Sequence, residues 1–340
     1  MKIIIPMAGR GSRLRPHTLT VPKPLIPIGG KPIVQRLAED ITKLSDQTVD
    51  EIAFIIGDFG PEIEKKLLDI AEKLGAKGTI YHQDEPLGTA HAIWMAKDSL
   101  NGPVVIAFAD TLFRADFQLD MNSDGVVWVK AVEDPSAFGV VKLDQYGVIT
   151  DFVEKPKQFV SNLAIIGIYF FKDGEGLREE IRNIIENDIR EEGGEYQLTD
   201  ALKHMLDKDK KFTLGPVDEW MDCGNKTVTV QTNAKILEFE KREFEQIPDS
   251  AKISNSLIIP PCFIGENVKV ENSKVGPYVS LGNGTRVIAS NIHNSLIQEN
   301  CIIEHGNLAD SMIGNNAEYY GVARNLSLGD YSVLDFKNKD

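Results

Sequence analysis

The N-terminal stretch combines glycines and basic residues in a spacing that suits a bound polyphosphate. An apolar run, residues 3–5, leads into the segment Ala8-Gly9-Arg10-Gly11. A strand that feeds a glycine-rich turn exposes backbone N–H groups, and such a concavity suits phosphate oxygens. Arg13, Arg15 and Lys23 follow, whereas the first acidic residue stands at position 39 of a chain that is acidic as a whole. The stretch therefore predicts a phosphate-binding loop.

Two widespread phosphate loops do not match this stretch. A P-loop requires GxxxxGK followed by Ser or Thr, and the stretch has no such pattern. The dinucleotide fingerprint GxGxxG begins at Gly9 and Gly11 but has Leu14 where the third glycine should stand. The predicted loop is therefore of a different kind.

Two further polar residues follow apolar strands. Gln83 comes after a short strand, and Asp110 follows a continuous apolar one. Amphipathic helices alternate with these strands, which predicts a parallel sheet covered by helices on both faces. Ligands bind beyond the carboxyl ends of such strands, so the glycine loop, Gln83 and Asp110 are expected at one edge. The strands are expected at residues 3–5, 51–57, 79–81 and 104–108, and the helices at 33–48, from 61 onward and at 89–100.

The chain from residue 126 to about 245 has shorter strands with alternating apolar and polar residues. Charged amphipathic helices interrupt them, and Ile247-Pro248 forms a boundary. Strands are expected at residues 126–132, 139–143, 148–153, 164–171 and 212–217, a further β-type stretch at 227–229, and helices at 174–190, 197–206 and 231–245.

After Ser250 the apolar residues recur every five or six positions, often with Gly or Asn between them. This is neither a helical period nor strand alternation. Hexapeptide repeats of this kind build a parallel β-helix, in which each coil buries its corner residues against the next. The alternative is an ordinary β-rich domain with Gly and Asn turns, and the five-residue steps predict some irregular coils. The repeating positions are Ile258, Ile264, Val270, Val275, Leu281, Val287, Ile292, Ile297, Ile303, Leu308 and Ile313.

Composition narrows the class of protein. The 340 residues suffice for two domains, and the net charge of −14 argues against nucleic acid or an anionic membrane as a partner. Three cysteines, Cys223, Cys262 and Cys301, have no metal-like spacing and favour a reducing compartment. We find no signal-peptide pattern and no apolar stretch long enough to span a bilayer. A cytoplasmic protein is expected.

The full N-terminal pattern is more specific than its glycines. G-x-G-S-R-L-x-P-x-T, followed by P-K-P-L-I-P-I and G-K-P, closely resembles the signature of the sugar-1-phosphate nucleotidylyltransferases. The resemblance covers residues 1–245 and implies a doubly wound, mostly parallel, Rossmann-like α/β nucleotidyltransferase domain. A short left-handed parallel β-helix is expected at 251–340. The implied reaction joins an NTP to a sugar 1-phosphate and releases pyrophosphate.

The resemblance assigns the glycine loop to the triphosphate. Ala8, Gly9 and Gly11 match the nucleotide-binding loop, where glycines let the backbone approach phosphates. Arg13 would stabilise the leaving pyrophosphate, and Lys23, between two prolines, matches the lysine near the phosphates.

A second motif, Q-D-E-P-L-G-T-A-H-A, is implied to bind the base. Gln83 would pair with the edge of the base, and Gly88 would pack close to its ring. An amide offers both a donor and an acceptor, which suits thymine or uracil and favours dTTP or UTP. Guanine stays an alternative, because P-L-G-T-A, residues 86–90, also resembles the mannose-1-phosphate guanylyltransferases.

A pair of carboxylates is implied to bind Mg²⁺, which prefers oxygen ligands and phosphates. Asp110 is one of them. Asp222 lies in W-M-D-C-G-N, which resembles the family pattern W-x-D-x-G-T with Asn225 in place of Thr.

The remaining matches are implied to hold the sugar 1-phosphate, with glucose 1-phosphate favoured. Gly139 would offer backbone groups to sugar hydroxyls, Glu154 would accept hydrogen bonds from them, and Lys155 would bind the phosphate. Asn162 matches a polar sugar contact. Glu195, in E-Y-Q-L-T-D, is read as a structural or sugar-side contact.

Alternatives to a single-activity enzyme stay open at this point. One is a bifunctional enzyme whose β-helix is an acyltransferase, with His293 and His305 as the histidines of that region. Another is a regulatory homologue that binds nucleotide or sugar only, although such proteins tend to lose charged site residues. A structural or oligomerising β-helix is favoured, so a homo-oligomer is expected.

Overall fold

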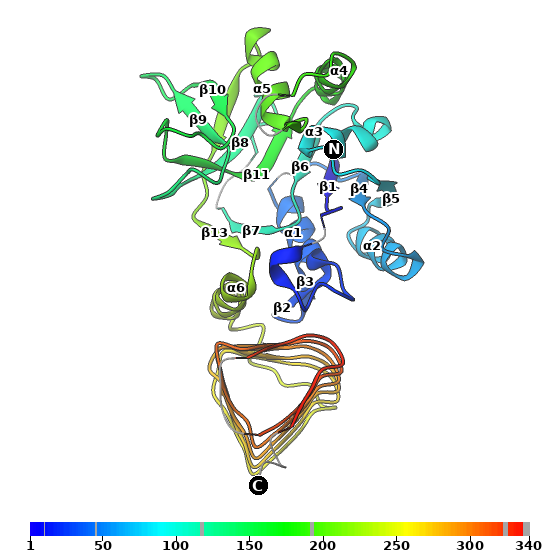
Figure 1. Cartoon of the computed structure of the whole chain (residues 1–340), viewed down its shortest axis with the longest axis vertical. Coiled ribbons are helices and arrows are strands. Elements are labelled where there is room, and N and C mark those ends of the chain that lie inside the picture. The colour runs from blue at the N-terminus through cyan, green and yellow to red at the C-terminus, as the bar shows by residue number, and fades with distance from the viewer. Residues whose placement is uncertain (10, 45, 116–118, 191–193, 322–325, 336–340) are drawn as a thin grey trace. The chain divides into compact units, whose positions relative to one another are not determined.

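The chain forms two compact units (Figure 1). The computed structural model describes residues 1–9, 11–44, 46–115, 119–190, 194–321 and 326–335. The first unit consists of residues 1–9 and 35–220, and the second of residues 10–34 and 221–340. The segment 10–34, which carries most of the predicted phosphate loop, therefore belongs to the same unit as the C-terminal repeats.

The first unit is built around four parallel strands in the order β5-β4-β1-β6. Strand β1 is hydrogen bonded to β4 on one side and to β6 on the other, and Ile3, Ile4 and Ile5 are fully buried. Burial on both faces explains why these strands read as continuous apolar runs. The predicted parallel sheet is confirmed here: β1 is Lys2–Pro6, β4 is Glu51–Ile56, β5 is Lys77–His82 and β6 is Val104–Ala107.

The later strands extend the same sheet, and two of them, β10 and β11, run opposite to the central parallel strands. Strand β11 lies antiparallel to β6, β8 and β9, and β10 is antiparallel to β9. The nine-stranded sheet is therefore mixed: β8, β9 and β12 share the direction of β1, β4, β5 and β6, whereas β10 and β11 run against it. The expectation of a mostly parallel sheet holds in part. These strands are β8 (Gly125–Ala131), β9 (Val140–Leu143), β10 (Ile149–Val153), β11 (Leu163–Phe171) and β12 (Phe212–Gly215), with β7 at Thr111–Arg114 and β13 at Glu219–Asp222.

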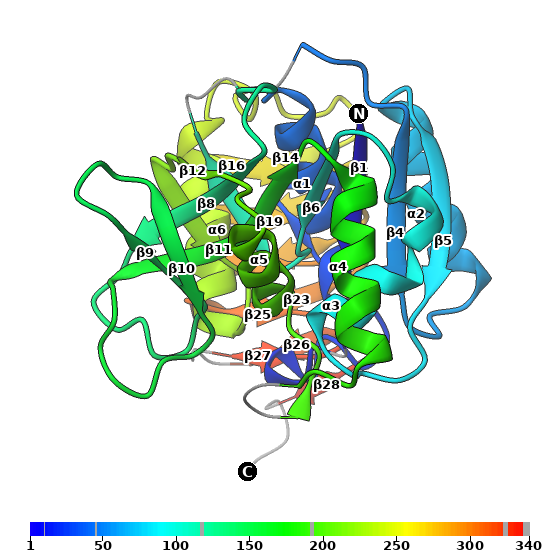
Figure 2. The same ribbon diagram turned by 90° about the horizontal axis from the view of Figure 1, so that it is seen from above.

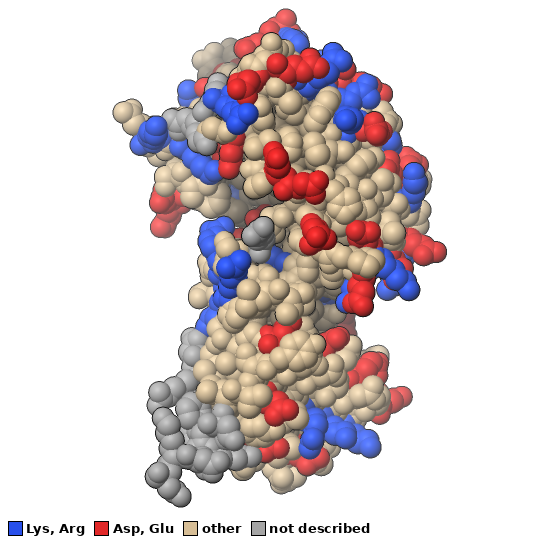
Figure 3. Space-filling model, turned by 45° about the vertical axis from the view of Figure 1, so that its right-hand side comes forward, with Lys and Arg blue, Asp and Glu red and all other residues tan. Residues whose placement is uncertain are grey.

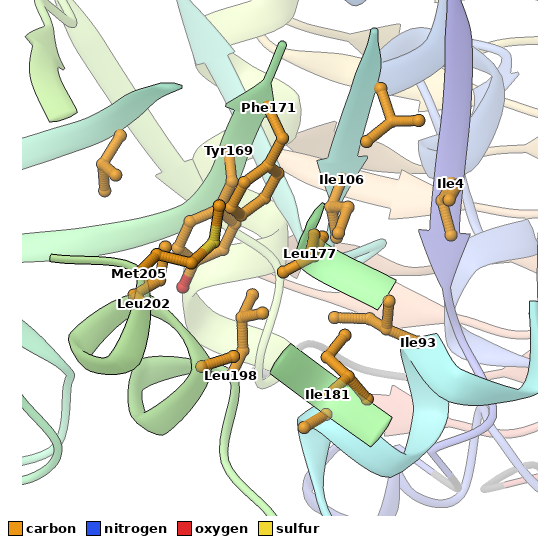
Figure 4. Close-up of a cluster of buried hydrophobic side chains, with 14 of the residues drawn as sticks. Ile4, Ile93, Ile106, Tyr169, Phe171, Leu177, Ile181, Leu198, Leu202 and Met205 are labelled. Carbon is orange, nitrogen blue, oxygen red and sulfur yellow. The ribbon is translucent and has the colours of Figure 1, made fainter. Parts of the chain in front are cut away.

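Helices α3, α4 and α5 share one hydrophobic core with the sheet (Figure 4). Their apolar positions recur at helical spacing, so each helix buries one stripe. Helix α3 is Thr89–Met95, α4 is Gly174–Glu186 and α5 is Leu198–Asp207, while α1 is Ile33–Thr42, α2 is Pro61–Lys73 and a 3₁₀ turn spans Lys97–Ser99. The labelled side chains are Ile93, Leu177, Ile181, Leu198, Leu202 and Met205 of the helices and Ile4, Ile106, Tyr169 and Phe171 of the sheet.

The second unit contains three parallel sheets whose strands come in rotation along the chain. Each strand pairs with an equivalent strand one coil further on, and Lys252, Lys269, Arg286, Ile302, Glu318 and Val333 mark successive partners. The coils between these partners are 17, 17, 16, 16 and 15 residues long, by subtraction of the residue numbers. All are shorter than three full hexads, as the five-residue steps predict.

The strands of the three sheets are short. The first sheet contains β14 (Lys252–Ser254), β17 (Lys269–Glu271), β20 (Arg286–Ile288), β23 (Ile302–Glu304), β26 (Glu318–Tyr320) and β28 (Val333–Asp335). The second contains β15 (Leu257–Ile258), β18 (Lys274–Val275), β21 (Asn291–His293) and β24 (Asn307–Ala309). The third contains β16 (Cys262–Ile264), β19 (Val279–Leu281), β22 (Ser295–Ile297), β25 (Met312–Ile313) and β27 (Ser327–Leu328).

The central coils bury apolar residues on all three sides and turn at left-handed residues. Val270, Val287, Ile303 and Tyr319 stack as one fully buried column. Many turns have positive φ at Asn, which tolerates the left-handed region better than other side chains. Asn255, Asn272, Asn267, Asn300 and Asn316 are of this kind. The Gly and Asn residues between the apolar positions are therefore corner residues.

Helix α6 (Lys226–Phe239) precedes the repeats and contains residues 227–229. The sequence predicts a β-type stretch there, and that prediction is wrong. Asn225 is the physical reason, because its side chain accepts hydrogen bonds from the backbone N–H groups of Thr227 (3.0 Å) and Val228 (3.3 Å). An N-cap of this kind outweighs the weak strand preference of Thr and Val.

The surface carries both kinds of charge. On the face in view in Figure 3, acidic side chains are spread among Lys and Arg. Among the described residues, no helix is long and apolar enough to cross a membrane.

The cap of α6 gives a first prediction. Asn225→Ala should lower the free energy of unfolding by about 1 kcal/mol, because two N–H groups at the start of α6 lose their acceptor. Threonine also caps helices, so Asn225→Thr should lower the free energy of unfolding much less. Urea denaturation of the three proteins measures the difference, and equal stability of Asn225→Ala and wild type would contradict the capping role.

Candidate active site

The carboxyl ends of the central parallel strands bring three predicted site segments to one edge of the first unit. The amide of Ala109 donates to the carbonyl of Pro6 (3.4 Å), so β1 and β6 end side by side. The amide of Gln83 donates to the carbonyl of Ile56 (2.8 Å), which places the end of β5 beside that of β4. The predicted residues that leave this edge are Ala8, Gly9, Gln83 and Asp110.

Gln83 is oriented by a histidine that sequence reasoning did not assign. Its amide nitrogen lies 3.1 Å from Nδ1 of His91 and 3.4 Å from the carbonyl oxygen of Gly88. Burial lowers the pKa of His91, which favours the neutral ring and a lone pair on one ring nitrogen. With Nδ1 as the acceptor, the amide nitrogen is engaged with the protein, and the amide oxygen is the end that can accept from a ligand.

Gly88 is required by a close approach of two backbone segments. It has φ +117°, and a Cβ at this position would lie 2.4 Å from the carbonyl oxygen and 2.7 Å from the nitrogen of Tyr196. Hydrogen bonds join the same segments, from Tyr196 N–H to the Leu87 carbonyl (2.8 Å) and from Ala90 N–H to the Tyr196 carbonyl (2.9 Å). The two motifs that contain Gly88 and Tyr196 therefore form one packed structure.

The segment around Glu195 is fixed through side chains as well. Thr89 donates to the amide oxygen of Gln197 (3.0 Å), and the amide nitrogen of Gln197 donates to the Glu195 carboxylate (3.0 Å). Glu195 thus has a structural contact, which agrees with one of the two roles expected for it. Thr89 and Gln197 are positioning residues that the sequence motifs contain but do not single out.

Gly139 and Glu154 meet on a second part of the first unit. A Cβ on Gly139 would lie 3.0 Å from Oε2 of Glu154, so the absent side chain leaves room for the carboxylate. Thr199 donates to the same oxygen (3.4 Å). Burial, with a smaller contribution from the charge of Glu154, raises the pKa of Tyr169. Glu154 also lines a cavity of about 270 Å³ together with Pro156, Lys157, Gln158, Gln197 and Asp200.

Lys155 has an unusual backbone conformation beside this carboxylate. Its φ is +38°, a region that few residues other than glycine adopt. Its amide donates to the Phe138 carbonyl (3.1 Å), and its exposed Nζ lies 3.5 Å from Oε1 of Glu154. Strained backbone of this kind is concentrated at functional sites. Asn162 is exposed, and its carbonyl accepts from the Val132 and Ala164 amides.

The second unit holds Gly11, Arg13 and Lys23. Gly11 has φ +58°, and a Cβ there would lie 2.9 Å from Cβ of Lys23. Lys23 is only 8% exposed, so its stem packs against the glycine rather than extending into solvent. Arg13 is exposed, within the 3₁₀ turn Ser12–Leu14, whose Leu14 is buried. The turn therefore anchors through Leu14 and presents Arg13 on the surface.

Asp222 ends β13 in a half-buried position. Its backbone carbonyl accepts from the hydroxyl of Thr232 (2.7 Å) in α6. A Cβ on Gly224 would lie 3.0 Å from both carboxylate oxygens, so the glycine leaves space around them. No cluster of three or more His, Cys, Asp or Glu that could hold a metal occurs among the described residues.

Comparison with known proteins tests to which protein family the chain belongs. The family model for nucleotidyl transferases matches residues 2–238. The chain belongs to the nucleotidyl transferase family. Its first unit and the glycine loop fall within the matched range, so the chain is a nucleotidyl-transferring enzyme.

Relatives with different stated activities share this nucleotidyltransferase family. The chain is 28% identical to the glucose-1-phosphate thymidylyltransferase of Streptomyces antibioticus, over 99% of this chain and all of that protein. It is 32% identical to the bifunctional protein GlmU of Methanocaldococcus jannaschii, over all of this chain and 84% of that protein. A crystal structure of UDP-glucose pyrophosphorylase complexed with UDP-glucose matches with a TM-score of 0.57 and 24% identity, over 70% of this chain and 98% of that one. The last likeness concerns the fold alone.

The close approach at Gly88 gives a second prediction. Gly88→Ala should lower the free energy of unfolding by about 2 kcal/mol or more, since a left-handed alanine and a clash with Tyr196 both act. Gly75→Ala is the matched control, because Gly75 has φ +75° but open space around the missing Cβ. The free energy of unfolding of Gly75→Ala should fall by only about 1 kcal/mol. Equal losses in thermal or chemical denaturation would show that the backbone approach at Gly88 is unimportant.

Proposed function

We propose that this nucleotidyltransferase joins an NTP to a sugar 1-phosphate. A phosphate oxygen of the sugar 1-phosphate attacks the α-phosphorus of the NTP, the bond between that phosphorus and the β-bridging oxygen breaks, and pyrophosphate leaves. The observation that carries the proposal is the common edge at which Ala8, Gln83 and Asp110 leave β1, β5 and β6. Catalysis of this kind needs positioning and charge neutralisation rather than a covalent nucleophile.

The charge of the triphosphate is assigned to the glycine loop. Gly9 is exposed, and a Cβ there would have nothing within 4 Å, so the backbone is open to a ligand. Arg13 would donate to the leaving pyrophosphate, where charge develops during bond cleavage. The packed stem of Lys23 restricts its rotamers, which lowers the entropy lost when its ammonium group binds phosphate.

The base is assigned to Gln83, with dTTP or UTP favoured. The hydrogen bond to His91 supports this choice, because it directs the amide nitrogen to the protein and leaves the oxygen for the imide N–H of thymine or uracil. Gly88 contributes its carbonyl to the same amide.

The sugar 1-phosphate is assigned to the part that carries Gly139 and Glu154, with glucose 1-phosphate favoured. The Glu154 carboxylate lines a cavity and would accept hydrogen bonds from sugar hydroxyls. Lys155 would bind the sugar phosphate through its exposed ammonium group, and Asn162 would contact the sugar.

Asp110 and Asp222 are the proposed protein ligands of Mg²⁺. Both are half-buried carboxylates, and the room that Gly224 leaves at Asp222 suits a hard cation. Mg²⁺ commonly takes one or two carboxylates and completes its shell with water and substrate phosphates, so a pair fits. When bound, the ion would neutralise charge on the phosphates.

The C-terminal repeats are proposed to be a left-handed parallel β-helix that follows a catalytic domain of residues 1–245. The rotation of strands among three parallel sheets supports the β-helix. We further propose that the protein acts in the cytoplasm without nucleic acid or membrane partners, which the net charge and the sparse cysteines support. The β-helix is proposed to be structural or oligomerising, so a homo-oligomer is expected.

The proposal is tested by a pyrophosphate-release panel. Each of dTTP, UTP, ATP, CTP and GTP is combined with glucose 1-phosphate and with other sugar 1-phosphates in the presence of Mg²⁺. We expect release with dTTP or UTP and glucose 1-phosphate. A preference for GTP would overturn the base assignment, and no release from any pair would overturn the function.

The carboxylates give a third prediction. Asp110→Asn and Asp222→Asn should each reduce turnover about 100-fold or more, because several kcal/mol of charge stabilisation are lost. Asp69→Asn, an exposed change on α2, should leave turnover unchanged. Thermal denaturation checks that the variants are folded. Near-normal turnover of both site variants would exclude the metal assignment.

The base contact gives a fourth prediction. Gln83→Ala should raise KM for the preferred pyrimidine triphosphate about tenfold, since a buried pair loses roughly 1–2 kcal/mol, and should change KM for the sugar phosphate little. His91→Ala should reduce the difference in KM between pyrimidine and other triphosphates. Without the imidazole, the Gln83 amide can flip and present either its oxygen or its nitrogen to the base. If KM rises equally for every nucleotide in both variants, Gln83 only stabilises its loop and does not select the base.

A further inference from the structure

The stretch that carries Arg13 and Lys23 contacts the rest of the second unit at two places, one on the C-terminal repeats and one on α6 and the repeats. The stretch and the repeats both belong to the second unit, and Figures 1 and 2 show the blue N-terminal segment beside the orange and red coils. We use the name phosphate segment for residues 11–34 and the name last coil for residues 326–335. The contacts join residues about 310 positions apart in the sequence.

His17 connects the phosphate segment to the last coil. Its side chain is 1% exposed, and its Nε2 lies 2.8 Å from the hydroxyl oxygen of Ser327. The charged form is disfavoured here, because burial lowers the pKa of His17 to about 4 despite the opposing effect of Asp330, with Lys226 acting in the same direction as burial. A neutral histidine is therefore buried between the segment and the coil.

Two more contacts lie beside His17. The hydroxyl of Thr20 donates to the carboxylate of Asp330, whose other oxygen accepts from the backbone N–H of Asn315 (2.7 Å). Asp330 thus joins the segment to two successive coils. A Cβ on Gly329 would lie 2.8 Å from Cβ of Pro16, so the coil backbone and the proline ring are in direct contact.

The other end of the phosphate segment is held through α6 and an earlier coil. The amide of Gly29 donates to the side-chain oxygen of Asn233 (3.0 Å), a fully buried residue that also accepts from Ser280 (2.7 Å). A Cβ on Gly30 would lie 2.3 Å from the ring of Phe263. Arg13 precedes the contact at His17, and Lys23 lies between this contact and the one at Gly29. The phosphate segment is therefore anchored at two places.

We propose that the last coil holds the phosphate segment in its binding conformation, with His17, Ser327, Gly329 and Asp330 as positioning residues. The repeats then have a second role besides the assembly role expected from the sequence. The inference rests on the proposed function insofar as it assigns the segment to the triphosphate. The contacts restrict the segment before the ligand arrives, so less conformational entropy is lost on binding.

The main test uses Gly329→Ala in the full-length protein. The new methyl group must displace Pro16, three residues from Arg13, and we expect KM for the NTP to rise at least about fivefold with little change in KM for the sugar 1-phosphate. Gly265→Ala is the matched control. Its methyl group meets Asn283 at 2.6 Å, a contact of similar closeness that lies wholly within the repeats. The control should leave both KM values unchanged.

A second readout does not need activity. Trypsin can cut the segment between residues 11 and 30 after Arg13 only, because Arg15 and Lys23 are each followed by proline. Gly329→Ala and Ser327→Ala should speed this cleavage severalfold relative to wild type, whereas Gly265→Ala should not. Cleavage sites are assigned by mass spectrometry.

The outcomes separate the inference from the proposed function. Faster cleavage in the last-coil variants, together with no pyrophosphate release by the wild-type protein, would reject the proposed function and keep the anchoring. An active wild type with unchanged NTP KM and unchanged cleavage in Gly329→Ala and Ser327→Ala would overturn the inference. Equal effects in Gly265→Ala would also overturn it, since the cause would then be a general loosening of the repeats.

Discussion

The position of β1 between two parallel neighbours is the constraint on which the first unit depends. Its backbone is hydrogen bonded to both β4 and β6, and its side chains are buried on both faces, so the strand has no freedom to shift. The chain must therefore emerge at one fixed point, where the glycines begin. Because β4, β5 and β6 run in the same direction, their loops emerge at the same edge, and polar residues from distant parts of the sequence converge.

Much of this arrangement follows from local patterns in the sequence. The apolar runs of β1, β4 and β6 are long enough to identify buried strands, and parallel order follows from the intervening helices. The direction of β11 is not a local property, because its apolar run fits either orientation and only its partners decide it. In α6, one polar residue outside the apolar pattern determines the structure, since the cap at Asn225 outweighs the strand preference of residues 227–229.

The candidate site likewise contains residues that sequence motifs identify and residues that only the structure reveals. Gln83, Asp110 and Glu154 belong to motifs that can be read directly, whereas their supports are visible only in three dimensions. His91 is eight positions from Gln83 and contacts it because a turn and the start of α3 bring them together. Thr199 reaches Glu154 from a helix 45 residues away. His17 is a lone histidine in a basic stretch, and no spacing in the sequence relates it to Ser327.

The coils shorten from 17 to 15 residues along the chain while their strands stay paired. Register between coils is set by the pairing of short strands, and single residues can be removed at corners without disturbing it. A complete coil is likewise a self-contained unit, because each contacts mainly its neighbours. Natural variation in length should therefore come in whole coils or single corner residues. The final coil is the exception, since the phosphate segment packs against it and fixes its distance from α6 along the stack.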